Sequence, residues 1–290
     1  MSGRKLTRRP VVNAALMTVA GSALALAAFV PIAAQGAQGR GQGAPPGPDG
    51  RGRGQAPQTP QAAAPIDLTG WWVSIVTEDW RWRMVTPAKG DYASMPMNAE
   101  ARRVADTWDP AKDEREGNAC KSYGAAGIMR VPGRVHVTWE NDSTLKIETD
   151  AGTQTRLLRF GDATPTGEPG WQGYSAATWE IAGGGGRGGP PGGGAGRGAA
   201  AAPAPRFGSL KVVTTRMKPG YLRKNGVPYS ENAVVTEYFD RHSETNGDEW
   251  FTVTTIVDDA KYLNQPFITS TGFKKERDGS KWRPTPCAAS

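Results

Sequence analysis

Apolar and polar residues alternate along most of the chain beyond residue 65, which is typical of strands that bury one face. Within 134–140, two valines and a tryptophan share one face, and the residues between them are polar or charged. The alternation resumes across 145–148 and 153–160 after two polar turns, so we expect a three-strand meander. Further strands are predicted at 71–76, 80–86, 173–182, 208–217, 232–241, 249–258 and 266–274.

About ten sequential strands, joined mostly by hairpins, indicate a mainly β protein. The dipeptides Asn225-Gly226 and Asn246-Gly247 favour tight hairpin turns. We therefore expect an antiparallel, lipocalin-like barrel, or a sandwich, with a small helical insertion.

The helical insertion is predicted to begin at Asn98, a good N-cap, and its apolar residues recur with helical spacing up to Trp108. Pro110 stops this helix, and a short second helix follows that Gly117 ends. We expect the two helices to cover one barrel end or an open edge.

Three segments have compositions that do not build a core. Residues 1–34 combine a basic start, an apolar stretch and small residues before a cleavage point after Ala34, as in an export signal. Residues 35–64 and 183–206 are rich in Gly, Pro and Ala and are predicted to be a disordered linker and a low-complexity loop. Residues 65–290 are then a single β-rich domain that the loop interrupts.

The signal predicts a periplasmic or extracellular location. Arg8-Arg9 before Pro10 resemble a weak twin-arginine signal, and we favour ordinary unfolded export over that route. An uncleaved anchor is the other alternative, but the Ala and Gly content makes the apolar stretch weakly hydrophobic. We expect cleavage and no stable membrane span afterwards.

The formal net charge of +7 would suggest a nucleic-acid partner if the excess lay on the folding part of the chain. Ten of the 35 basic residues but only one of the 28 acidic residues lie in the signal and the two low-complexity tracts. The remaining 25 basic and 27 acidic residues leave the folding part near neutrality. We therefore expect no nucleic-acid partner.

Cys120 and Cys287 are the only two cysteines. An even number in an exported chain predicts a disulfide, and the alternative is a pair of free buried thiols. The absence of Cys-x-x-Cys and of Cys/His clusters gives no readable metal site.

Two resemblances add to this pattern. Gly70-Trp71-Trp72 is similar to the Gly-x-Trp that opens the first strand of lipocalins, a resemblance that implies a small-ligand barrel. Residues 171–267 resemble an exported bacterial family of unknown function, which implies neither a reaction nor a substrate. The matching segments are Trp171–Ser175, Trp179-Glu180, Leu210–Thr215, Gly226–Ser230, Thr236–Phe239, Ile256–Asp259 and Pro266-Phe267.

Charge on an apolar strand face marks candidate ligand-binding residues. Glu237 and Arg241 alternate with Val235 and Phe239, so burial of that face would carry both charges inward. A buried carboxylate needs a cation, and Arg241 or Arg216 is the expected partner. A structural ion pair is the alternative to a ligand anchor.

Two further segments supply the other candidates. The sequence Trp80-Arg81-Trp82-Arg83 would place tryptophans on one strand face and Arg81 and Arg83 on the other. The segment 217–231 is expected at a barrel rim, where Tyr221, Arg223 and Tyr229 would contribute to recognition.

These observations favour noncatalytic binding of a small, partly apolar molecule inside the barrel, with no cofactor. One rival is a secreted enzyme whose acid–base pair combines Glu237 with His242 or Asp240. The other is an envelope interaction or structural domain with a filled core. An open pocket of several hundred Å³ would separate a binding protein from a packed structural domain.

Overall fold

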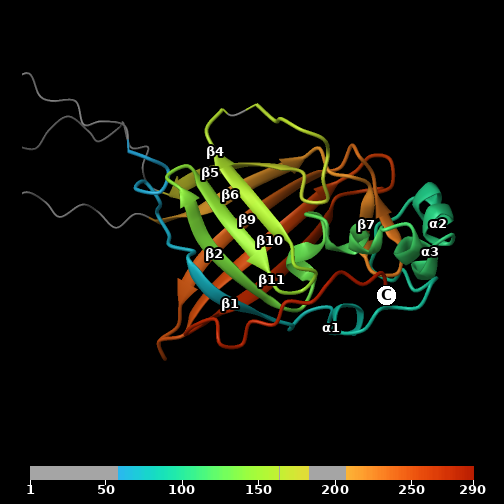
Figure 1. The fold of residues 1–290 in the computed structure, drawn as a ribbon, viewed down its shortest axis with the longest axis horizontal. Helices are drawn as coiled ribbons and strands as arrows, with labels where there is room; N and C mark the ends of the chain where they lie inside the picture. Colours follow the sequence, from blue (N-terminus) through green and yellow to red (C-terminus); the bar gives the residue numbers. More distant parts are fainter. Residues whose placement is uncertain (1–57, 163, 183–206) are drawn as a thin grey trace, which may run out of the picture. The chain divides into compact units, whose positions relative to one another are not determined.

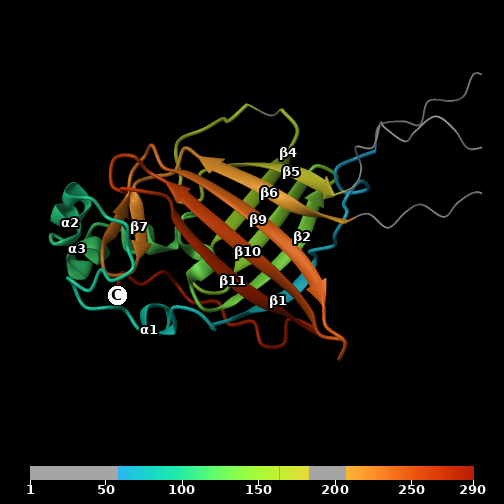
Figure 2. The ribbon, with the colours of Figure 1, turned by 180° about the vertical axis from the view of Figure 1, so that it is seen from behind.

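The alternating segments pair into a closed barrel in the computed structural model, which describes residues 58–162, 164–182 and 207–290 (Figures 1 and 2). Around the wall the strands follow the order β1-β11-β10-β9-β6-β5-β4-β3-β2. Alternate residues of the strands are buried, so one face of each strand points into the barrel. The strands are β1 (Gly70–Ile75), β2 (Arg134–Asn141), β3 (Thr144–Thr149), β4 (Thr155–Phe160), β5 (Tyr174–Ala182), β6 (Phe207–Thr215), β9 (Val234–Ser243), β10 (Glu249–Asp258) and β11 (Phe267–Glu276).

Several predictions concern residues that are not described. The signal at 1–34, most of the linker at 35–64 and the loop at 183–206 lie outside the described residues. Among the helices that are described, none is long and apolar enough to cross a bilayer.

The barrel differs from the expected ten-strand antiparallel pattern in two ways. β4 and β5 run parallel, with Leu158 paired to Ser175, which requires the chain to return to the same end of the barrel before β5 begins. β7 (Gly220–Arg223) and β8 (Val227–Tyr229) form a separate hairpin outside the wall. The fold is therefore a mixed nine-stranded barrel with an accessory hairpin.

The predicted strand at 80–86 is wrong, because Trp80–Arg83 forms the short helix α1. β1 already pairs with β2 on one side and with β11 on the other, so it offers this segment no free edge. Asp79 precedes the helix with a φ of 51°, a left-handed conformation that interrupts the extended chain. The alternation of tryptophan and arginine in Trp80–Arg83 is therefore not evidence of a strand.

Helices and the accessory hairpin gather at one end of the barrel (Figure 1). The side chains of Asn98 and Asp109 accept hydrogen bonds from backbone amides three residues later. The first bond confirms the predicted helix start at Asn98, and the second caps the start of the short helix that follows. Gly117, with a φ of 71°, follows the second helix as expected. The elements here are α2 (Ala99–Ala105), α3 (Pro110–Arg115) and the 3₁₀ turns η1 (Ala119–Tyr123) and η2 (Ile128–Arg130).

Large side chains fill the interior of the barrel. Trp72 is fully buried and donates from Nε1 to the Leu68 carbonyl at 2.9 Å. The rings of Trp72 and Phe273 both pack against Phe251, and each pair of ring centroids is 4.7 Å apart. The space in which we expected a ligand is therefore occupied by the protein's own core.

The predicted disulfide is confirmed. Cys120 of η1 is bonded to Cys287 of the C-terminal tail, and their Cα atoms are 5.1 Å apart. The Gln154 amide lies 3.7 and 3.4 Å from the two sulfur atoms. The bridge thus ties the tail to the helical end of the barrel.

Glu237 is fully buried and bonded to an arginine, as predicted, but the arginine is Arg156 of β4. Arg156 donates from Nη1 and Nη2 to the two carboxylate oxygens at 3.0 and 2.5 Å. Since β4 and β9 are not neighbours in the wall, the pair spans the interior of the barrel.

The two arginines expected beside Glu237 lie elsewhere. Arg216 follows the end of β6 with a φ of 56° and is exposed, and it donates to the carbonyls of Pro165 and Gly167. This left-handed turn breaks the alternation that would have carried the side chain inward. Arg241 lies near the end of β9 and forms an ion pair with Glu249 of the adjacent β10.

Removal of the Glu237 carboxylate should leave the Arg156 guanidinium unpaired inside the barrel. We expect Glu237→Ala to lower the free energy of unfolding by about 3 kcal/mol, as for a broken buried ion pair. The double variant Arg156→Met/Glu237→Leu should lose less, because no unpaired charge remains buried. Guanidinium chloride denaturation measures both, with Arg241→Ala as a control at a partly exposed ion pair that loses at most about 1 kcal/mol. An equal loss in the single and double variants would contradict the ion-pair explanation.

The loop at 183–206 should be dispensable for stability. β5 and β6 pair up to Ala182 and Phe207 on either side of it, so a short Gly-Ser turn should connect the same strands. We expect replacement of 183–206 by such a turn to change the thermal midpoint by a few degrees at most, because closure entropy depends weakly on loop length. Differential scanning calorimetry tests this, and a loss of the folding transition would show that the segment is required.

Candidate functional site

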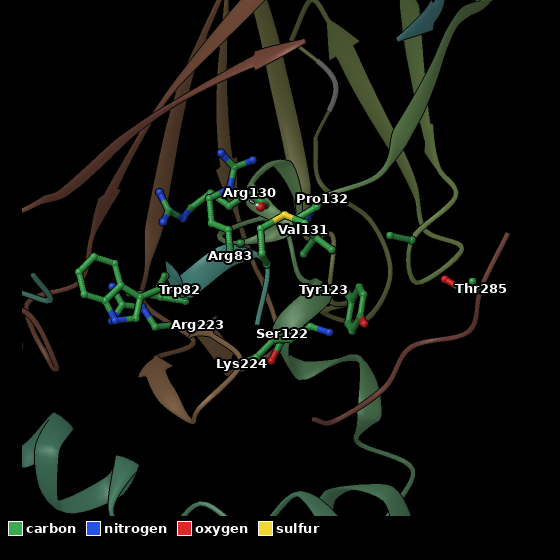
Figure 3. Close-up of a pocket in the computed structure, with 14 residues that line it drawn as sticks. Trp82, Arg83, Ser122, Tyr123, Arg130, Val131, Pro132, Arg223, Lys224 and Thr285 are labelled. Atoms are coloured by element: carbon green, nitrogen blue, oxygen red, sulfur yellow. Dashed lines mark hydrogen bonds between the residues drawn. The ribbon is translucent and has the colours of Figure 1, made fainter. Parts of the chain in front are cut away.

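A pocket of about 310 Å³ opens at the helical end of the barrel (Figure 3). Trp82 and Arg223 lie together at one side of it, and Tyr123 lies at the opposite side (Figure 3). The apolar and aromatic part of its lining comprises Trp82, Met84, Tyr123, Val131, Pro132 and Leu222, and the basic part comprises Arg83, Arg130, Arg223 and Lys224.

The pocket is built almost entirely by segments outside the barrel wall. Helix α1 supplies Trp82 and Arg83, the 3₁₀ turn η2 supplies Arg130, and β7 supplies Arg223. The long connection between β1 and β2 and the accessory hairpin therefore meet here. The barrel serves as the platform that holds them.

Arg83 is held by the protein itself. Its side chain is almost fully buried, and it forms an ion pair with Glu78. It also donates from Nε to the Arg130 carbonyl at 2.9 Å and from Nη2 to the Ser74 hydroxyl at 3.0 Å. Burial lowers the pKa of this guanidinium, and the Glu78 carboxylate partly opposes that shift.

Arg130 is buried as well, but its donors are only partly used. Nη2 donates to Asp79 at 2.8 Å, and the guanidinium lies over the Phe267 ring, 5.5 Å from its centroid. Nη1 is buried and has no hydrogen-bond acceptor among the described residues.

Arg223 has the least compensation of the three arginines. It donates from Nη1 to the Ala93 carbonyl at 3.0 Å and lies over the Trp82 ring at 5.0 Å. Within the part of the chain that the structure describes, no acceptor meets its buried Nη2. Burial, and then the charge of Arg130, lower the pKa of Arg223 to about 10, so the group stays cationic at neutral pH.

The pocket therefore carries an excess of positive charge. Arg83, Arg130 and Arg223 lie in its wall together with Lys224, whose Nζ lies 5.1 Å from the centroid of the Tyr123 ring. The ion pairs made to these four cations come from Glu78 and Asp79. The remaining positive charge would attract an anionic ligand more strongly than a neutral one.

Two of the predicted site residues meet in this pocket, and the others do not. Arg83 and Arg223 line it together, whereas Arg81 lies on the exposed side of α1 and pairs with Asp91 at 3.0 Å. Arg216, Arg241 and Glu237 lie in the positions described above. The neighbouring Tyr221 and Tyr229 line a second pocket of about 250 Å³.

In the second pocket Tyr221 donates to Asp113 at 2.8 Å, and Lys121 pairs with the same carboxylate at 2.5 Å. Burial and the Asp113 hydrogen bond raise the pKa of Tyr221. Tyr229 is buried, and burial raises the pKa of its phenol as well. The charges here compensate one another, so this pocket gives less reason to expect a ligand than the first.

The acid–base pair of the enzyme alternative, Glu237 with His242 or Asp240, does not form in the structure. Glu237 faces the barrel interior, whereas Asp240 and His242 lie on the opposite face of β9, where Asp240 is exposed and the His242 side chain is 48% exposed. Alternation along the strand keeps them on opposite surfaces. No group of three or more His, Cys, Asp or Glu side chains able to hold a metal occurs in the described residues.

Three residues that line the pocket were not among the predicted ligand-binding residues: Arg130, Tyr123 and Lys224. Arg130 and Tyr123 lie in 3₁₀ turns without a periodic pattern, so no local signal marks them as partners of α1. Lys224 falls within the segment 217–231 that we expected at a rim, and its neighbour Arg223 was the available clue.

Arg83 and Arg223 differ in how well their buried charges are paired and hydrogen-bonded. The same substitution should therefore change the free energy of unfolding differently at the two positions. We expect Arg223→Met to leave the free energy of unfolding unchanged or to raise it by up to about 1 kcal/mol, because an unpaired buried cation is removed. Arg83→Met should lower it by roughly 3 kcal/mol, since it breaks a bonded, buried cation. Urea denaturation in an anion-poor buffer at pH 7.5 compares them. Equal losses would show that Arg223 is as well compensated as Arg83.

The chain matches no protein-family model, no curated protein and no solved structure. The resemblances to lipocalins and to an exported bacterial family therefore stay expectations from the sequence.

Proposed function

We propose that this chain is an exported barrel protein that binds a small, partly apolar molecule without changing it chemically, in the pocket at the helical end. The observation that carries the proposal is the composition of that pocket. Its walls combine apolar side chains such as Trp82 and Leu222 with a few directed cations. Small-molecule sites typically have this mixture and a volume of roughly 300 Å³ or more.

The apolar surface beside the pocket supports an apolar body for the ligand. Trp80, Met84 and Val85 are 67%, 60% and 68% exposed, and Met84 lines the pocket. Large exposed apolar side chains that are close in the sequence to pocket residues often mark a binding surface. A ligand with an apolar part would cover some of this area.

The exported setting rests on the composition of residues 1–34. The Cys120–Cys287 bridge supports it, because disulfides persist mainly in oxidising compartments. Both observations are compatible with a periplasmic or extracellular binding protein.

A docking surface for another protein is the second candidate. The same exposed residues, Trp80, Met84 and Val85, favour it, because apolar anchors at a rim also serve protein partners. The two functions differ in which of these residues matter: a small ligand needs the pocket wall, and a protein partner would use the whole exposed group.

A charge placed in the pocket wall should block the small molecule. We expect Met84→Asp to weaken binding of the neutral fluorescent dye N-phenyl-1-naphthylamine at least fivefold, because the dye would have to desolvate the new carboxylate. Val85→Asp is the matched control, since Val85 is equally exposed and lies outside the pocket lining. Fluorescence titration gives both dissociation constants. If the dye binds both variants like the unmodified protein, it does not occupy the pocket, so the small-molecule proposal fails and the docking surface is favoured.

A further inference from the structure

Two arginines that line the pocket each have one buried guanidinium nitrogen without an acceptor among the described residues. Arg130 and Arg223 are 8% and 6% exposed, and both line the pocket. Arg130 Nη1 and Arg223 Nη2 meet no acceptor in the described parts of the chain, 58–162, 164–182 and 207–290. Buried polar groups are nearly always hydrogen-bonded, so two unused charged donors in one pocket require an explanation.

We infer that these two arginines form a subsite for an oxyanion, and that the molecule bound in the pocket carries a carboxylate or phosphate group there. The inference rests on the proposed binding function and adds the chemical class of the ligand. The apolar body of the ligand then lies against Trp82 and Met84, and its charged end lies at Arg130 and Arg223.

The geometry of the donors favours an oxyanion over a neutral acceptor. A guanidinium presents its N–H groups in a planar fork that matches the oxygens of a carboxylate or phosphate. Asp79 holds the other nitrogen of Arg130, and the Ala93 carbonyl holds the other nitrogen of Arg223. Each arginine is thus held by the protein through one nitrogen and keeps a second, buried nitrogen without an acceptor among the described residues.

The electrostatics point the same way. Burial, and after it the charge of Arg130, lower the pKa of Arg223 to about 10, which is still far above neutrality. An anion between the two arginines would relieve the repulsion as well as satisfy the donors. A cationic ligand would add to the repulsion and should be excluded.

The test compares three molecules that share one skeleton and differ in the end group. Isothermal titration calorimetry of the full chain at pH 7.5 measures 3-phenylpropanoate, 3-phenylpropanol and 3-phenylpropylamine, and inorganic phosphate is titrated separately. We expect the acid to bind at least tenfold more tightly than the alcohol, and the amine not to bind. Binding of phosphate alone, with no gain from the phenylpropyl group, would identify a free inorganic anion as the occupant of the subsite.

Substitutions test whether the preference for the acid over the alcohol depends on Arg130 and Arg223. Arg223→Met and Arg130→Met should each weaken binding of the acid at least tenfold and remove its preference over the alcohol. Arg223→Lys should restore part of the affinity, because it keeps the charge and loses the fork. Arg103→Met is the control, since Arg103 lies on the exposed surface of α2 and pairs with Glu100.

The outcomes separate the two proposals. If the alcohol binds as tightly as the acid, the oxyanion subsite is wrong and the binding function stands. If the dye and all three phenylpropyl compounds fail to bind while phosphate binds through Arg223, the binding function as proposed is wrong and the subsite stands. If Arg130→Met does not fold, Arg223→Met and Arg223→Lys decide the question alone. An unchanged affinity of the acid in Arg223→Met overturns the inference.

Discussion

Closure of the barrel through β1 determines where the rest of the chain can lie. β1 pairs with β11 on one side and with β2 on the other, so the first and last strands complete the wall. With both edges used, the segment between β1 and β2 cannot add a strand there and has to leave the wall. Its backbone groups are satisfied instead by short helices and turns, which begin at capping side chains such as Asn98 and Asp109. The helical end, and with it the pocket, follows from this closure.

The filled interior has a second consequence, because it moves the candidate site from the inside of the barrel to its end. Aromatic rings around Phe251 occupy one part of the interior, and the Arg156–Glu237 pair occupies another. Glu237 already has both carboxylate oxygens bonded to Arg156, so it has little left to offer a ligand. The barrel is then a rigid base, and the elements added to its end supply the side chains for recognition.

Period-two patterns predicted the strands of 134–160 and 232–258 well, because each of these strands has one buried face and one partly exposed face. The same rule failed at 80–83, where four alternating residues are too few to exclude a helical turn. Alternation also predicted that Glu237 is buried beside a cation, but it carries no information about which strand lies across a closed barrel. Arg130 left no local signal, since its contacts with Asp79 and Phe267 join segments far apart in the sequence.

The three buried arginines have different roles: Arg83 supports the structure, whereas Arg130 and Arg223 each keep a donor without an acceptor among the described residues. Arg83 donates its hydrogen bonds to groups of the protein, and the bond to the Arg130 carbonyl holds the backbone of η2 in place. Arg130 is oriented on one side by Asp79, and Arg223 is oriented by Ala93 and the Trp82 ring. Buried donors left unused lower the stability of a fold, and natural proteins tolerate such a loss mainly where function needs it. Because these contacts already hold the two guanidinium groups, an anion bound by them would cost little further ordering of their side chains, which favours binding.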